Sequence, residues 1–245
     1  MGFRAALDRA LFLLSVPKCV YCKERLEYSD LAFCRKCSAE FEKFKNRSCS
    51  LCARELHKCD CSMPRLERHG INRIFKVFRY IPREENRLPN SLIFALKQAN
   101  RRDVVRRSAD ELMTAMGASE TDFSGYTVTA IPRRRAAINK YGYDHSAALA
   151  RELARRLGAT YSPLLVSKAR RAQKGLHGNE RTKNTTYVIR RGATLKSDRV
   201  LIVDDVITTG ASMSEASEHL KTLGAKTVVA ATLSIAYKDP TVWFE

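Results

Sequence analysis

The sequence predicts an α/β fold with a mainly parallel sheet flanked by helices, preceded by a small cysteine-rich module. Short apolar runs alternate with helical stretches beyond residue 66, and Val200–Val203 is uninterrupted, as in a strand buried on both faces. All eight cysteines lie before residue 62. A chain of 245 residues has room for one ordinary domain and one small one. Pro64 and the charged stretch after it predict a boundary that separates residues 1–66 from residues 67–245.

The first residues favour a helix rather than an export signal. Phe3–Leu14 carries apolar side chains on one side and is predicted to be amphipathic. The apolar run Leu11–Val16 is too short for a signal peptide, and no small-x-small cleavage site follows it. The chain also has no apolar run of about 18 residues, so the sequence predicts a cytoplasmic protein without a membrane span.

The cysteines form four closely spaced pairs, which is the pattern of thiolate ligands for zinc. Eight thiolates would fill two four-cysteine sites with no open position, so the metal would be structural. The alternative is a disulfide framework, which requires an oxidising compartment. His57 lies between two of the pairs and could replace a cysteine as a ligand. The predicted zinc ligands are Cys19, Cys22, Cys34, Cys37, Cys49, Cys52, Cys59 and Cys61.

Beyond the boundary, helices alternate with short strands, which indicates a sheet whose ligands bind at the carboxyl ends of the strands. Leu92–Met116 is predicted to be mostly helical with a break near Asn100, and Ser146–Leu157 is a helix closed by Gly158. The predicted strands are Val128–Ile131, Leu164–Val166, Tyr187–Ile189, Val200–Val203 and Thr227–Ile235.

The net charge of +18 is concentrated in the middle of the domain. Residues 131–191 hold fifteen Lys and Arg residues against three Asp and Glu residues, and Arg133-Arg134-Arg135 directly follows a predicted strand end. A solvated face, a site for phosphate and pyrophosphate, and a nucleic-acid track are all compatible with this charge. Aromatic residues are sparse among these cations, which gives little support to a base-stacking platform.

Residues 200–212 carry the clearest chemical signal of the chain. Asp204 and Asp205 follow the apolar strand, and a small-residue turn then leads into a helix that begins near Ser212. Backbone N–H groups at such a turn and helix N-terminus bind an anion, and the hydroxyls of the turn add donors. The two carboxylates require sugar hydroxyls or a hydrated divalent cation. A ligand with a phosphate, a vicinal diol and Mg²⁺ is phosphoribosyl pyrophosphate (PRPP).

Other phosphate sites fit less well. The chain has no Gly-x-x-x-x-Gly-Lys-Ser/Thr sequence, and no Gly-x-Gly-x-x-Gly follows a strand. The run instead resembles the PRPP signature of the type I phosphoribosyltransferases: two acids, an apolar residue, then Thr-Thr-Gly-Ala-Ser. The predicted PRPP-binding residues are Asp204, Asp205, Val206, Thr208, Thr209, Gly210, Ala211 and Ser212.

The order of features over nearly the whole chain resembles the ComF family of phosphoribosyltransferase-like proteins with an N-terminal zinc ribbon. The matching segments are Phe78-Arg79-Tyr80, Leu92-Ile93, Leu96-Lys97, Ala130-Ile131-Pro132, Gln173-x-x-Leu176, Glu180-Arg181-x-x-Asn184 and Leu223-Gly224-Ala225. One segment departs: Tyr141–His145 stands where the family has Arg-Gly-Phe-Asn-Gln, so an arginine is lost and a carboxylate is gained.

The resemblance implies a type I phosphoribosyltransferase-like fold and transfer of ribose 5-phosphate from PRPP to an unidentified nitrogenous acceptor, with Mg²⁺ and a link to DNA uptake in natural transformation. Asp204 and Asp205 would be the catalytic acids. Candidates for the pyrophosphate and for a closing lid are Lys97, Arg133, Lys140, Gln173, Lys174 and Arg181. The five histidines form no recognisable catalytic pattern. The alternative is a competence protein without catalysis that senses PRPP or binds single-stranded DNA.

Overall fold

The computed structural model describes residues 16–29, 31–49, 51–81, 86–98, 100–117, 119–168 and 187–236. The predicted helix Phe3–Leu14 and the candidates Gln173, Lys174 and Arg181 lie outside them. The elements in chain order are α2 (Arg35–Lys45), η1 (Leu56–Lys58), α3 (Pro64–Arg68), β1 (Ile71–Tyr80), α4 (Arg87–Gln98), α5 (Arg102–Gly117), β2 (Thr127–Ala130), α6 (Arg135–Tyr141), α7 (His145–Leu157), β3 (Thr160–Tyr161), β4 (Leu165–Ser167), β5 (Tyr187–Ile189), β6 (Arg199–Ile207), α8 (Ala211–Thr222) and β7 (Thr227–Ala236).

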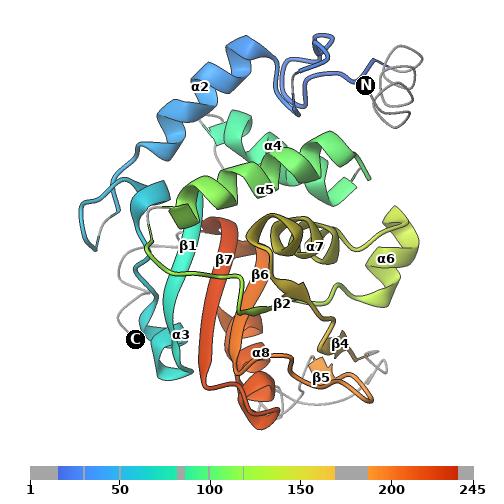
Figure 1. Cartoon of the computed structure of the whole chain (residues 1–245). Coiled ribbons are helices and arrows are strands. Elements are labelled where there is room, and N and C mark those ends of the chain that lie inside the picture. The colour runs from blue at the N-terminus through green and yellow to red at the C-terminus, as the bar shows by residue number, and fades with distance from the viewer. Residues whose placement is uncertain are drawn as a thin grey trace, which may run out of the picture.

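A five-stranded sheet in the order β1-β7-β6-β2-β3 forms the centre of the molecule, and all of its pairings are parallel. Helices α5 and α7 pack on the sheet from one side, and α3 and α8 lie together on the other (Figure 1). A separate antiparallel pair, β4-β5, lies beyond the end of the sheet. The predicted α/β class with a mainly parallel sheet is therefore confirmed.

Each face of the sheet buries its own hydrophobic cluster, because the alternate side chains of a strand point to opposite faces. Leu201 and Val203 of β6 face the cluster beneath α5 and α7, whereas Val200 and Ile202 face the cluster beneath α8. Burial on both faces is why the apolar residues of β6 form a continuous run instead of alternating with polar residues.

The cysteine-rich segment shares the first of these clusters. Phe41 of α2 is fully buried, with its ring centroid 5.2 Å from that of Phe33 and 5.6 Å from that of Phe78 on β1. Three cysteines of the segment belong to the same cluster as the side chains of α4 and α5. The segment is therefore packed directly onto the sheet domain, and the domain boundary near Pro64 stays a prediction.

Most predicted elements lie within a residue or two of the observed ones. The long predicted helix is broken as expected, since α4 ends at Gln98 and α5 begins at Arg102. Gly158 closes α7 in the left-handed conformation, with φ of +65°. The strand predicted at Val200–Val203 is longer and continues to Ile207, because β7 pairs with it as far as Ile235.

The edge strand β1 has no counterpart among the predicted strands. Its sequence, Ile71-Asn72-Arg73-Ile74-Phe75-Lys76-Val77-Phe78-Arg79-Tyr80, mixes charged and apolar residues without a regular period. The pairing with β7 also shifts register between Ile71 and Ile74. Tertiary contacts with the cysteine-rich segment explain two of the polar residues: Arg73 binds Asp60, and Lys76 binds backbone carbonyls of that segment.

Candidate functional site

The acid pair lies where the sheet opens. Strand β2 pairs with β6 only as far as Ala130, opposite Val203, so Asp204 and the residues after it have β7 as their strand neighbour on one side alone. In a parallel sheet, ligands bind at the carboxyl ends of the strands, in the crevice formed where neighbouring connections diverge. Asp204 and Asp205 lie near this edge of the sheet, in the C-terminal half of β6 rather than after its end as the sequence predicted.

The small-residue turn after β6 presents its side chains to solvent. Thr208, Thr209 and Ser212 are exposed, and Gly210 caps the N-terminus of α8 with φ of +76°. A Cβ atom on Gly210 would also come within 3.1 Å of the Leu66 side chain, so glycine is required here both for the turn and for packing. Exposed hydroxyls and a helix N-terminus, which are features that bind anions in proteins, therefore adjoin each other after β6.

Asp204 and Asp205 contact different partners. Asp204 Oδ1 accepts hydrogen bonds from Ser146 Oγ at 3.0 Å and from the backbone N–H of Asp205 at 2.9 Å. Asp205 Oδ2 lies 2.8 Å from Lys97 Nζ and 3.5 Å from His145 Nε2. Three elements distant in sequence, α4, α7 and β6, thus bring a cation, an imidazole and two carboxylates together.

The two carboxyl groups have opposite tendencies to ionise. Burial and the negative charge of Asp205 raise the pKa of Asp204 well above its ordinary value. Burial acts in the same direction on Asp205, but the hydrogen bond from His145 and the positive charge of Lys97 outweigh it and lower the pKa of Asp205. Asp205 is thus the carboxylate that pairs with Lys97, whereas its burial and the neighbouring charge disfavour ionisation of Asp204.

These shifts give a paired prediction for stability measured without ligand. The raised pKa of Asp204 contributes stability to the folded protein. This contribution is complete below the pKa of an aspartate in the unfolded chain, about 4, and is lost as pH rises through the pKa of Asp204 in the folded protein. The lowered pKa of Asp205 contributes stability above that value, which is lost as pH falls. Between pH 5 and pH 8, we therefore expect D204N to gain thermal stability relative to the wild type and D205N to be the less stable of the two variants. Thermal unfolding midpoints of D204N and D205N that do not differ from each other in this direction would contradict the opposite pKa shifts of the two aspartates.

The structure explains the segment Tyr141–His145, whose sequence differs from the family pattern. Gly142 closes α6 with φ of +76°, and the buried Tyr143 hydroxyl donates to the carbonyl of Leu96, while burial raises the pKa of Tyr143 to about 12. The carboxylate of Asp144 caps α7 by accepting from Ala147 N at 3.0 Å and also accepts from Arg133 N at 3.3 Å. The added carboxylate is thus used in capping, and it places His145 against Asp205.

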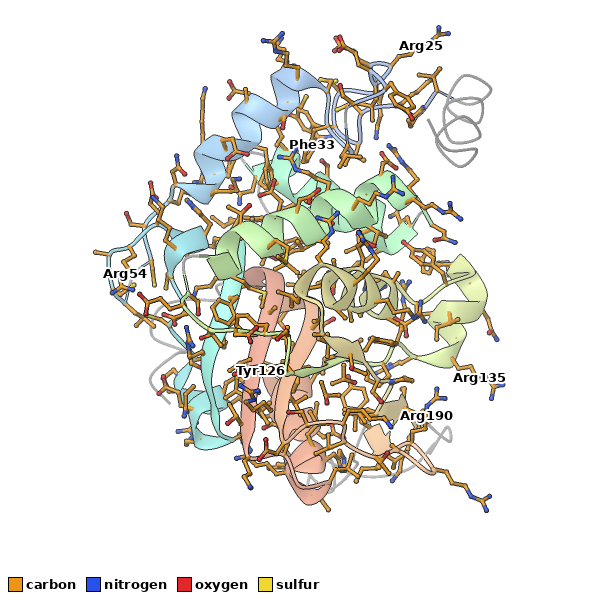
Figure 2. The ribbon with its side chains drawn as sticks, viewed as in Figure 1. Arg25, Phe33, Arg54, Tyr126, Arg135 and Arg190 are labelled. Atoms are coloured by element: carbon orange, nitrogen blue, oxygen red, sulfur yellow. The ribbon has the colours of Figure 1, made fainter. Side chains whose placement is uncertain are left out.

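The described pyrophosphate candidates lie at different depths. Lys97 reaches the acid pair, whereas Arg133 is half-buried, donates to the Lys97 carbonyl at 3.2 Å and lies 4.6 Å from the Tyr141 ring centroid. Lys140 is exposed on α6. Arg134 and Arg135 are also exposed, and Figure 2 shows Arg135 at the outer edge of the molecule. The basic run therefore splits into one residue that supports the site and two that face solvent.

Three side chains near the site lie outside the residues singled out from the sequence. His145 contacts Asp205, Ser146 donates to Asp204, and the buried Tyr187 hydroxyl is hydrogen-bonded to Ser212. The backbone N–H of Tyr187 also donates to Glu215 of α8 at 2.8 Å, so strand β5 is tied to the phosphate turn. Sequence spacing contains no signal for these contacts, because each joins segments at least 25 residues apart.

The eight cysteines form two separate clusters of four. Cys19, Cys22, Cys34 and Cys37 make the first, and Cys49, Cys52, Cys59 and Cys61 make the second, with the sulfur atoms of each within 4.8 Å of one another. Cys22 Sγ and Cys34 Sγ are 3.6 Å apart, and Cys52 Sγ and Cys59 Sγ are 3.5 Å apart. A disulfide requires about 2.0 Å, whereas four sulfurs at about 2.3 Å from one Zn²⁺ lie roughly 3.8 Å apart. The donor sets therefore fit tetrahedral zinc.

Both clusters begin with the same hairpin, displaced by 30 residues. Lys23 and Ala53, each directly after the second cysteine, have φ of +70° and +58°, and their N–H groups donate to the carbonyls of Cys19 and Cys49. Figure 2 labels Arg25 and Arg54 on these two hairpins. His57 is not a member of either cluster: its Nδ1 lies 3.1 Å from the Lys45 carbonyl.

Comparison with known proteins bears on the C-terminal part of the chain. Residues 144–240 match the family described as the phosphoribosyl transferase domain. The chain therefore contains a phosphoribosyltransferase-like domain, and its fold is of the type I phosphoribosyltransferase class. No curated protein sequence matched the chain. In the part that the structure describes, every helix is too short or too polar to cross a bilayer.

Solved structures with similar folds include several phosphoribosyltransferases. The purine enzyme from Pyrococcus horikoshii is 21% identical, with a TM-score of 0.35 and coverage of 54% of this chain and 73% of that one. The orotate enzyme from Aeropyrum pernix is 20% identical, with a TM-score of 0.36 and coverage of 60% and 64%. An allosteric regulatory enzyme of purine biosynthesis is 19% identical, with a TM-score of 0.37; the match covers 52% of this chain and about a quarter (25%) of that one.

Proposed function

We propose that this chain binds PRPP at the carboxyl end of β6 and transfers ribose 5-phosphate to a nitrogenous acceptor. The observation that carries the proposal is the placement of an acid pair directly before an exposed hydroxyl-rich turn and the N-terminus of α8. The backbone N–H groups of that turn and the hydroxyls of Thr208, Thr209 and Ser212 bind the 5-phosphate, and the two aspartates receive the ribose hydroxyls.

The reaction is a displacement at the anomeric carbon of the ribose. The bond from this carbon to the pyrophosphate oxygen breaks, a bond to the acceptor nitrogen forms, and positive charge develops on the sugar between these events. The carboxylates of Asp204 and Asp205 stabilise that charge. Lys97, which lies 2.8 Å from Asp205, is the cation that would bind the departing pyrophosphate. When bound, Mg²⁺ neutralises the pyrophosphate, and Asp204 and Asp205 are the oxygen donors that would hold it through water.

We further propose that the chain is of the ComF type, with two structural zinc ions in the module at residues 1–66 and the transferase domain at residues 67–245. The segments that resemble this family support the assignment, together with the two four-thiol clusters. Eight free thiols suit the reducing cytoplasm. A role in DNA uptake, with single-stranded DNA or the uptake machinery as partner, follows from the same resemblance.

The decisive experiment is an assay of pyrophosphate release from PRPP, with and without a panel of nucleobases and other amines, and with single-stranded DNA. We expect release that depends on one class of acceptor. A protein that binds PRPP in calorimetry but releases no pyrophosphate with any acceptor would favour the alternative of a PRPP sensor.

The exposed cations at the N-terminal end of α6 favour a second role in binding a polyanion such as single-stranded DNA. Because Arg134 and Arg135 face solvent, R134Q/R135Q should reduce DNA affinity without altering the fold. The salt dependence of binding should flatten by about 1.4 units for two lost phosphate contacts, at roughly 0.7 for each. Arg133→Gln should instead affect PRPP binding, since Arg133 contacts the backbone of Lys97. Unchanged DNA binding in the double variant would leave these arginines as a solvated face.

A further inference from the structure

Lys76 is a buried cation without a carboxylate partner among the described residues. It lies in β1 and is only 4% exposed. Its ammonium group donates to three backbone carbonyls, those of Cys61 at 3.0 Å, Cys59 at 3.1 Å and Ile74 at 3.3 Å. These three carbonyls supply no negative charge, and the side chain of Cys59 is a further hydrogen-bond partner of the ammonium group. Burial of an ammonium is costly unless an anion compensates its charge.

The acidic residue that adjoins both of these cysteines in sequence is already engaged. Asp60, between the two cysteines that Lys76 contacts, accepts from Arg73 Nε at 2.7 Å. The buried Lys45 provides a comparison in the same protein: it is 6% exposed, and its ammonium group lies 2.9 Å from Glu111 and 2.5 Å from Glu42. Lys45 thus has the carboxylates that Lys76 lacks.

The other possible source of negative charge beside Lys76 is the second cysteine cluster, which contains Cys59 and Cys61. Zinc held by four thiolates carries a net charge of minus two, whereas four thiols or two disulfides are neutral. The zinc-bound form therefore supplies negative charge that compensates a buried ammonium group, whereas four protonated thiols or two disulfides supply none. We infer that Lys76 is the internal counter-ion of the second cysteine cluster and positions the backbone of Cys59 and Cys61 for metal binding. This inference depends on the proposed zinc at that cluster.

The two clusters differ in how they are held, which makes the role of Lys76 specific. Cys19, Cys34 and Cys37 belong to the large hydrophobic cluster shared with α4 and α5. The second cluster has a small core of its own, formed mainly by Cys49, Leu56 and Cys59. Lys76 and Arg73 of β1 make polar contacts that help to attach the second cluster to the sheet domain. Loss of Lys76 should therefore weaken metal binding at the second cluster and leave the first unchanged.

The test compares zinc release to a chromogenic chelator from the full-length wild type and from K76M, K76Q, K76R and K45M. The wild type should hold two zinc ions. K76M should keep one tightly and bind the other roughly 10- to 100-fold more weakly, as for the loss of an outer partner of a metal site. K76R keeps the charge and should recover most of this loss. K45M replaces a similarly buried lysine that pairs with carboxylates, and this variant should release zinc at the wild-type rate.

Lys76→Gln separates charge from hydrogen bonding, since its amide keeps two donors without the charge. Zinc release from K76Q at the wild-type rate would overturn the counter-ion role, as would equal weakening in K45M. Cobalt spectra provide a second measurement: thiolate-to-cobalt absorption should correspond to two sites in the wild type and to one tight site in K76M. A wild type with metal only at the first cluster would instead refute the proposed second zinc, so the two failures are distinguishable.

Discussion

Replacement of both Asp204 and Asp205 by asparagine is expected to weaken binding of magnesium PRPP at least about tenfold, the loss of one good charge-assisted contact. Asp205 should give the larger single effect, because it is the carboxylate that Lys97 and His145 hold ionised. Calorimetric titration with PRPP and Mg²⁺ measures the change.

Asp198, which directly precedes β6, provides a matched control. Asp198→Asn removes an exposed carboxylate that lies 3.1 Å from Lys226, away from the acid pair, and should leave PRPP affinity unchanged. Circular dichroism should show that all variants keep the fold. Wild-type affinity in the double variant would refute the assignment of the site.

Removal of zinc is expected to have the largest effect on stability. Structural zinc contributes about 10–16 kcal/mol of binding free energy in small zinc-finger peptides, and such modules unfold without it. Treatment with a chelator under reducing conditions should therefore abolish hydrogen-exchange protection in the hairpins at Cys19 and Cys49. Because the first cluster shares its core with α4 and α5, protection should also fall in those helices, while β6 and β7 retain it.

Elemental analysis checks the premise of this prediction. The purified protein should contain close to two zinc ions per chain, and all eight thiols should react with a thiol reagent once the protein is denatured. Absence of zinc together with cysteines paired as disulfides would rule out the metal sites. Replacement of His57 by alanine serves as a control, since His57 contacts the Lys45 carbonyl rather than a cluster and should leave the zinc content unchanged.

Much of the fold and of the candidate site follows from local pattern. A strand buried on both faces needs an unbroken apolar run, so Val200–Val203 identified β6. The turn that follows has glycine with positive φ at position 210, between small polar neighbours, which the local sequence indicates. Four closely spaced cysteine pairs, likewise, predicted two sets of four thiolate ligands, and the cysteines do gather in two groups of four. These features depend on residues adjacent in the chain, which is why the sequence alone determined them.

The tertiary structure alone decided which distant groups meet. Lys97, His145 and Asp205 come from α4, α7 and β6, and their contact depends on how two helices pack over one face of the sheet. The burial of Lys76 beside the second cysteine cluster likewise depends on β1, a strand with no regular hydrophobic period. Packing between elements selects these contacts, and no spacing along the chain encodes them.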